Sequence, residues 1–187
     1  MEGPIEWDMI PGPFICLSIF AIDSILFNVN LPYWARGVLD EPAHALTMAL
    51  VLVALPRRPS RDFVISALIC SVILDADHLP ILFHTGWLEP ATGRPDTHSL
   101  VVVVLVAVAG AAFRVDRPVI AGIVTGLLVH LGRDLATGTV PLLWPAVSEQ
   151  FHVPYLAYAL TLICLAAFAA GRPPIPVFLR FHGRPGS

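Results

Sequence analysis

The sequence predicts an all-α membrane protein, a polytopic bundle of about six transmembrane helices with both termini in the cytoplasm. Hydrophobic residues make up 56% of its 187 residues, whereas soluble domains contain about 45–50%. A helix that crosses a bilayer needs about 20 consecutive, mostly apolar residues. Runs of nearly this length occupy residues 10–29, 38–55, 62–84, 97–114, 118–137 and 153–171.

These runs divide one membrane domain, residues 1–187, into four parts. The first run is expected to remain attached, because it follows an acidic rather than a basic start and Asp23 interrupts it. An ionisable group inside a span needs a partner or becomes neutral, and this applies to Asp23. The parts are an additional N-terminal span (1–37), a helical core that carries the polar stretches (38–145), the last span (146–171) and an Arg- and Pro-rich cytoplasmic tail (172–187).

Arginine residues indicate the orientation of the bundle. Short loops rich in Arg remain in the cytoplasm, and Arg gathers in the connections 56–61 and 114–117 and in the tail. The other connections, 30–37, 85–96 and 138–152, are poor in Arg and contain Trp or Tyr. Such residues are typical of the membrane–water interface, so these connections should face outward. The net charge of −3, without a basic run, argues against nucleic acid as a partner.

Four short polar stretches interrupt the apolar sequence: EPAH at 41–44, DADH at 75–78, DTHS at 96–99 and HLGRD at 130–134. The predicted topology places all four at the outer ends of helices. Residues three or four apart share one face of a helix. This spacing pairs Glu41 with His44, Asp75 with His78, and His130 with Asp134. The sequence therefore predicts one cluster of imidazoles and carboxylates, assembled from facing helices.

Imidazole and carboxylate groups together favour a divalent metal, Zn²⁺ first and then Mn²⁺ or Fe²⁺, whereas Mg²⁺ prefers oxygen ligands. The expected ligands are His44, Asp75, His78, His98, His130 and Asp134. They exceed the needs of one tetrahedral ion, so either two ions bind or some of the groups orient the true ligands. The alternative for a single polar residue is a solvated position or a helix cap, which we assign to His84, His152, His182, Asp62 and Asp116.

Further charged residues complete the expected site. Asp77 or Glu41 is expected to act as the general base, although Glu41, beside Pro42 in the expected first turn, could equally be a helix-start charge. Arg133 and Arg94 are nearby cations that could bind the phosphate group of a substrate. Both could instead extend towards the membrane interface.

The segments HALTMAL, LDADHLP, DTHSL and HLGRDLATGTVPLLWP resemble the blocks of the YdjM-type inner-membrane metal-dependent hydrolases. The resemblance extends from about Pro42 to Pro145. It implies a bacterial inner-membrane location and a metal site formed by His44, Asp75, Asp77, His78, His98, His130 and Asp134. Leu74 stands where the family usually has Pro, and the residues 94–96 replace its usual basic lead-in to the THS block.

These features predict a membrane-embedded metal-dependent hydrolase with one or two divalent ions. Water on such an ion has its pKa lowered to about 7 and can attack a phosphoryl or carbonyl group. A site at the outer interface would suit a membrane lipid, or a similar amphipathic ester or phosphate ester, as substrate. Two alternatives stay open. One is a non-hydrolytic metalloenzyme, either an isoprenoid diphosphate lyase or cyclase or a di-iron oxidase, and the other is a metal or proton transporter.

Overall fold

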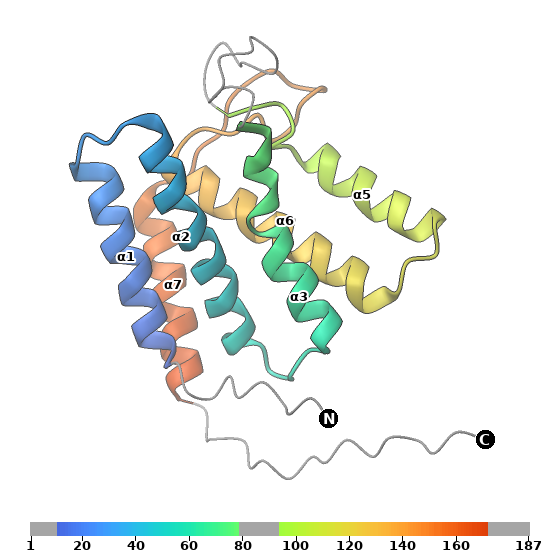
Figure 1. Ribbon diagram of the computed structural model, residues 1–187, viewed down its shortest axis with the longest axis horizontal. Helices are drawn as coiled ribbons and strands as arrows, with labels where there is room; N and C mark the ends of the chain where they lie inside the picture. The colour runs from blue at the N-terminus through green and yellow to red at the C-terminus, as the bar shows by residue number, and fades with distance from the viewer. Residues whose placement is uncertain (1–10, 79–93, 172–187) are drawn as a thin grey trace.

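The computed structural model describes residues 11–78 and 94–171. Within these ranges the protein is all-helical, as predicted, and its β-type pairing is limited to an isolated bridge between Val140 and Phe151. The elements are α1 (Gly12–Asn28), α2 (Tyr33–Ala54), α3 (Arg61–Cys70), the 3₁₀ helix η2 (Ile73–His78), α5 (Leu100–Ala112), α6 (Arg117–Thr137) and α7 (Tyr155–Ala170) (Figure 1). Each of the six predicted apolar runs overlaps one of these α-helices.

Residues at the helix starts explain where several helices begin. Pro11, Pro32 and Pro154 stand directly before α1, α2 and α7, where the fixed backbone of proline is compatible with a starting helix. Ser60 caps α3, since its Oγ accepts a hydrogen bond of 3.3 Å from the backbone N–H of Phe63.

Helix α2 differs from the prediction at its start. It begins at Tyr33 rather than at residue 38, directly after Pro32. Glu41 and Pro42 therefore lie inside the helix, and the interpretation of Glu41 as a helix-start charge does not hold. Pro42 removes one helical hydrogen bond, a loss that membrane helices tolerate when neighbouring groups satisfy the freed carbonyl.

The third apolar run is a broken helix rather than one continuous span. α3 ends at Cys70, and η2 follows after a short turn. At this break the carbonyl oxygen of Ser71 lies 2.9 Å from Nδ1 of His130 in α6. The break therefore brings the end of α3 to the side chain of another helix, and η2 presents its polar residues beside α6.

The helices form two groups that meet along α2 and α6 (Figure 1). In the first group, α1, α2 and α7 pack around a core that includes Ile15, Ile19, Leu50 and Leu162. In the second group, α5 and α6 pack around Val103, Leu127, Leu131 and Val140, and α3 lies against α6. Polar side chains gather between the two groups, at one end of the bundle.

Two glycines of α6 allow α3 to approach closely. A Cβ atom at Gly122 would collide with the carbonyl oxygen of Phe63, and one at Gly126 would collide with that of Ala67. Such small residues four apart are typical of close helix contacts in membranes. The contact fixes the end of α3, and with it η2, relative to the polar half of α6.

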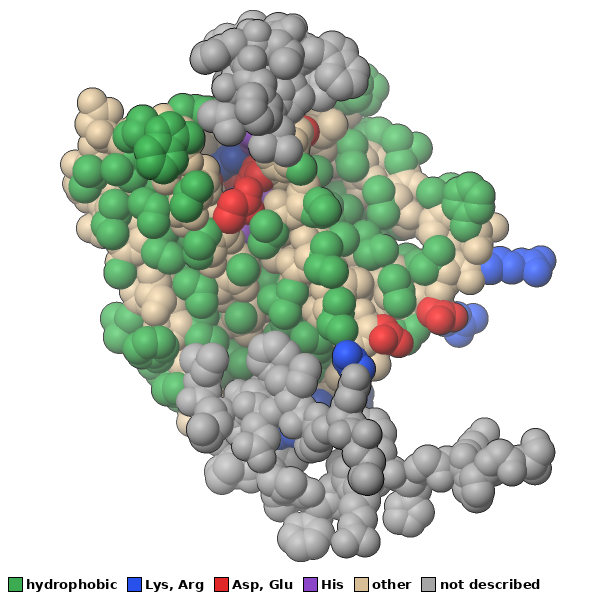
Figure 2. All heavy atoms as spheres, viewed as in Figure 1, with side chains coloured by type: hydrophobic (Ala, Val, Ile, Leu, Met, Phe, Trp, Pro, Cys, Tyr) green, Lys and Arg blue, Asp and Glu red, His purple; other side chains and the backbone are tan. Residues whose placement is uncertain are grey.

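The face of the bundle shown in Figure 2 is largely apolar. Large hydrophobic side chains are exposed on several helices, for example Leu17, Val104, Leu105, Leu156 and Phe168. Two helices among the described residues, Tyr33–Ala54 and Arg117–Thr137, are long and apolar enough to cross a membrane, and α1, α5 and α7 are shorter apolar helices. The six-span topology remains a prediction.

Candidate metal centre

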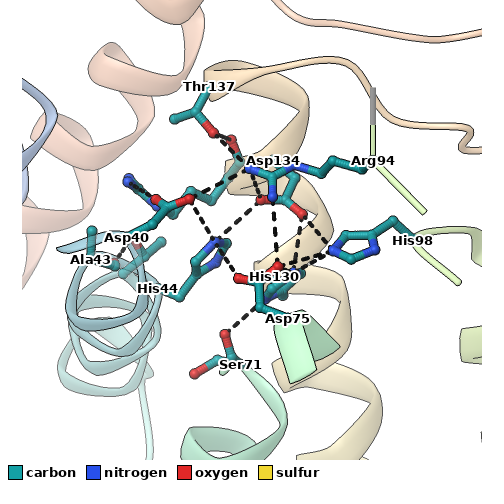
Figure 3. Close-up of polar contacts among 12 residues, drawn as sticks. Asp40, Ala43, His44, Ser71, Asp75, Arg94, His98, His130, Asp134 and Thr137 are labelled. Atoms are coloured by element: carbon teal, nitrogen blue, oxygen red, sulfur yellow. Dashed lines mark hydrogen bonds and ion pairs between the residues drawn. The ribbon is translucent and has the colours of Figure 1, made fainter. Parts of the chain in front are cut away.

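Four parts of the chain bring His and Asp side chains to one place in the polar end of the bundle (Figure 3). They are α2, η2, the segment before α5, and the C-terminal half of α6. The side chains of His44, His98, His130 and Asp134 are fully buried. Charged and imidazole groups at this depth need partners, because burial without them carries a high cost in free energy.

His44 of α2 faces the carboxylates of η2 and α6. Its Nε2 lies 3.2 Å from Oδ1 of Asp134 and 3.5 Å from Oδ2 of Asp75. Its ring is stacked on that of His130, with the ring centroids 4.0 Å apart. His44 therefore joins α2 to both carboxylate-bearing elements.

His130 of α6 has a defined orientation. Its Nδ1 donates a hydrogen bond to the carbonyl oxygen of Ser71 at 2.9 Å, because a carbonyl oxygen can only accept. In the neutral ring, Nε2 then carries the lone pair. This atom faces the cluster, 3.0 Å from Oδ2 of Asp134 and 3.3 Å from Nε2 of His98. A backbone carbonyl behind an imidazole is a common way to orient a metal-binding histidine.

A second group of ligand atoms surrounds η2. Oδ1 of Asp77 lies 2.9 Å from Nδ1 of His78, and Oδ2 lies 3.2 Å from Nδ1 of His98. The hydroxyl of Thr97 also donates a hydrogen bond to Asp77. Oδ1 of Asp75 is 3.3 Å from Nδ1 of His78 and 3.2 Å from Nε2 of His98. Asp75 therefore lies between this group and the buried groups of α2 and α6.

The donor atoms fit a divalent metal. Three sets of residues each offer ligand atoms within 4.8 Å of one another: Asp75, Asp77, His78 and His98; Asp75, His98, His130 and Asp134; and Asp40, His44 and Asp75. Asp75 belongs to all three sets. Among the described residues, both ring nitrogens of His44 and both carboxylate oxygens of Asp134 are buried without a hydrogen-bond partner. Buried polar atoms are rarely left so, and a bound cation would satisfy them.

Charge supports the same conclusion. The guanidinium groups of Arg94 and Arg133 are outnumbered by the carboxylates around them, which are those of Asp23, Asp40, Asp75, Asp77 and Asp134. Buried negative charge without a counter-charge is unfavourable. Protonated histidines or bound cations are needed to balance it.

Arg94 lies against the cluster, just before the DTHS stretch. Its Nη2 is 2.8 Å from Oδ1 of Asp134 and 3.6 Å from Oδ2 of Asp40, and its Nη1 is 3.6 Å from Oδ1 of Asp75. Burial alone would lower the pKa of this guanidinium, but the three carboxylates, Asp134 foremost, raise it above its usual value. Arg94 therefore remains a cation at the edge of the candidate site.

Arg133, which the sequence predicts to bind the phosphate of a substrate, instead lies buried among other helices. Its side chain is fully buried and points towards α1, α2 and α7, where Nη2 lies 2.7 Å from Oδ1 of Asp23 and 2.7 Å from Oδ1 of Asp40. Nη1 donates to the hydroxyl of Tyr158 at 3.3 Å. Arg133 is thus the partner that Asp23 required, and the geometry favours a structural role for it.

Sequence reasoning missed Asp40. This residue is four positions before His44, and its Oδ2 lies 3.9 Å from Nε2 of that histidine. Its other oxygen is held by Arg133. The sequence contains this spacing of four, but the prediction pairs His44 with Glu41, at a spacing of three. In the structure Oε2 of Glu41 is buried without a hydrogen-bond partner.

The fold and the buried cluster together define a helical membrane protein with a candidate site for a divalent metal. The chain belongs to the YdjM inner membrane protein family, which it matches over residues 40–185. This match confirms the family and the membrane location that the sequence blocks implied. It begins at Asp40, so α1 precedes the matched part. No curated protein and no solved structure matches the chain.

Proposed function

We propose that this protein is a membrane-embedded, metal-dependent hydrolase that acts on a lipid or lipid-phosphate ester near the outer face of the bacterial inner membrane. The observation that carries the proposal is the buried set of His and Asp ligand atoms, several of which approach one another and Arg94 within ion-pair distance without forming a hydrogen bond. Such atoms belong to His44 of α2 and Asp134 of α6. The carbonyl oxygen of Ser71 orients the ring of His130 so that its Nε2 faces the same cluster.

The roles of individual residues follow from their partners. His44, Asp75, His98, His130 and Asp134 would hold the ion or ions, with Asp77 and His78 beside them. A divalent ion there would supply Lewis-acid activation of water and of the scissile group. Glu41 is the best-placed proton acceptor, since its buried Oε2 has no partner and its side chain lines a cavity beside the cluster. Asp77 is already engaged by Thr97, His78 and His98.

Metal analysis of the purified protein tests this function. Wild-type protein in detergent should contain near-stoichiometric zinc, manganese or iron, and the double variant His130→Ala/Asp134→Ala should lose most of it. The matched control is His152→Ala/Asp116→Ala, which removes an exposed imidazole and an exposed carboxylate outside the cluster. Folded wild-type protein that takes up none of these metals would overturn the proposal.

A further inference from the structure

A cavity of about 400 Å³ adjoins the His and Asp side chains of the candidate metal centre. Its wall is formed by the end of α1, the first half of α2, η2, Arg94 and Thr137. Asp40, Asp75 and His78 are also among its lining residues, so a molecule inside the cavity would contact the proposed metal ligands. Clefts of about 300–1,000 Å³ are the usual size of small-molecule sites.

The rim of the cavity is apolar and exposed. Phe27, Trp34 and Val38 line it, and their side chains are 51%, 60% and 64% exposed. Arg36 and Arg94 also line the cavity, one at the exposed rim and one at the cluster. Acidic, basic and histidine side chains come to the surface in Figure 2 on the flank of the bundle where α1, α2 and α3 lie, surrounded by hydrophobic ones. The cavity thus joins an apolar flank to a charged interior.

The size of the cavity limits what it holds. At about 400 Å³ it is near the small end of ligand sites, which is enough for a polar head group and the beginning of one hydrocarbon chain. The rest of such a chain would continue over Trp34 and Val38, which are one helical turn apart on α2. A divalent metal held by the cluster would offset the excess of carboxylates, and with it Arg36 and Arg94 favour an anionic head group, because guanidinium forms paired hydrogen bonds with phosphate oxygens.

Gly37 lines the cavity and places no side chain in it. It lies on the cavity-lining face of α2, between Trp34 and Glu41, and a Cβ atom added there would meet no other atom within 4 Å. A larger side chain at this position would grow into open space without displacing its neighbours. The absence of a side chain at residue 37 therefore keeps the path from the rim to the cluster open.

From these features we propose that the cavity binds a single-chain amphiphile with a phosphate head group, which enters from the flank of the bundle. The head lies at Arg94 and the metal cluster, and the chain passes Gly37 and leaves over Trp34 and Val38. This inference rests on the proposed function, since it names the class of substrate that the same site takes.

Binding of dodecyl phosphate tests the inference without a need for turnover. Wild-type protein in phosphatidylcholine nanodiscs should bind it with an affinity at least tenfold higher than for inorganic phosphate or dodecanol. Gly37→Leu should weaken this binding at least tenfold. Gly37→Ala and Gly132→Leu should bind almost as wild type does, because a Cβ at Gly132 also meets nothing within 4 Å and that residue does not line the cavity.

The metal content of the same samples separates this inference from the proposed function. Unchanged metal in Gly37→Leu together with lost binding supports the cavity as the chain path. If Gly37→Leu binds dodecyl phosphate as tightly as wild type, or if inorganic phosphate or dodecanol binds equally well, the inference is overturned while the metal centre stands. If wild-type protein holds no metal, the proposed function fails whatever the binding result.

Discussion

Arg133 of α6 and Asp23 of α1 form a buried ion pair, with Nη2 2.7 Å from Oδ1. The hydroxyl of Tyr155 donates to the other oxygen of Asp23 at 2.6 Å, and the same nitrogen of Arg133 contacts Asp40. This pair therefore connects α1 and α7 to a carboxylate at the candidate metal centre. Because α1 precedes the part of the chain that matches the family, the pair also helps to attach this additional helix, whose apolar side chains pack against α2 and α7.

Replacement of Arg133 should destabilise the fold strongly. Arg133→Met leaves the carboxylates of Asp23 and Asp40 buried without their cation, and breaking a buried pair in this way costs about 3–5 kcal/mol. Thermal unfolding in detergent measures the change. Arg117→Met, which alters an exposed arginine at the start of the same helix, should have little effect. Equal stability of the two variants would contradict the role assigned to the buried pair.

Asp40 should contribute to metal affinity although it is outside the predicted ligand set. Asp40→Asn keeps the shape of the side chain but removes the negative charge 3.9 Å from His44. Loss of a residue that ligates or orients a ligand typically weakens metal binding 10–100-fold. Competition with a chelator measures this affinity, with Asp62→Asn in the exposed first turn of α3 as the control. An affinity equal to that of the control would restrict Asp40 to its contact with Arg133.

Local patterns in the sequence are sufficient to predict the helices and most of the residues of the His and Asp cluster. A helix that crosses a bilayer needs a run of about 20 mostly apolar residues, so the apolar runs indicate where the helices lie. Residues four apart share one face of a helix, so the spacing of His130 and Asp134 indicates that they point the same way. The all-helical fold was therefore predictable, and the resemblance of the four sequence blocks was sufficient for the family. The structure also brings together the expected groups of α2, η2 and α6 around Asp75.

Other features depend on contacts between distant segments, and no local pattern contains them. The break between α3 and η2 is accompanied by a contact of Ser71 with His130, across two helices. The direction of Arg133 depends on where α1 packs, since its partner Asp23 lies far away in the sequence. The position of Arg133 within a polar stretch predicts a substrate contact, whereas in the structure its guanidinium contacts Asp23, Asp40 and Tyr158.

The contact between α3 and α6 should be sensitive to side-chain size. Gly126→Val places its side chain against the carbonyl oxygen of Ala67 and near Ser71, and overpacking of this kind costs about 1–3 kcal/mol. The displacement should also lower the metal content, because Ser71 orients His130. Gly132→Val is the matched control in the same helix, with open space around the added atoms. Unfolding temperature and bound metal are the two measurements, and identical values for both variants would contradict the proposed coupling.

The orientation predicted from Arg can be tested by labelling single cysteines. The three native cysteines, Cys16, Cys70 and Cys164, are free and can be replaced first. Glu149→Cys then lies in an exposed position between α6 and α7, and Asp116→Cys in the exposed connection before α6, where its side chain makes no cap hydrogen bond.

Since short Arg-rich loops stay in the cytoplasm, a membrane-impermeant maleimide should label residue 149 in intact spheroplasts. Residue 116 should react only after permeabilisation. The reverse pattern would move the metal centre to the cytoplasmic face, and labelling of both residues from outside would contradict a span through α6.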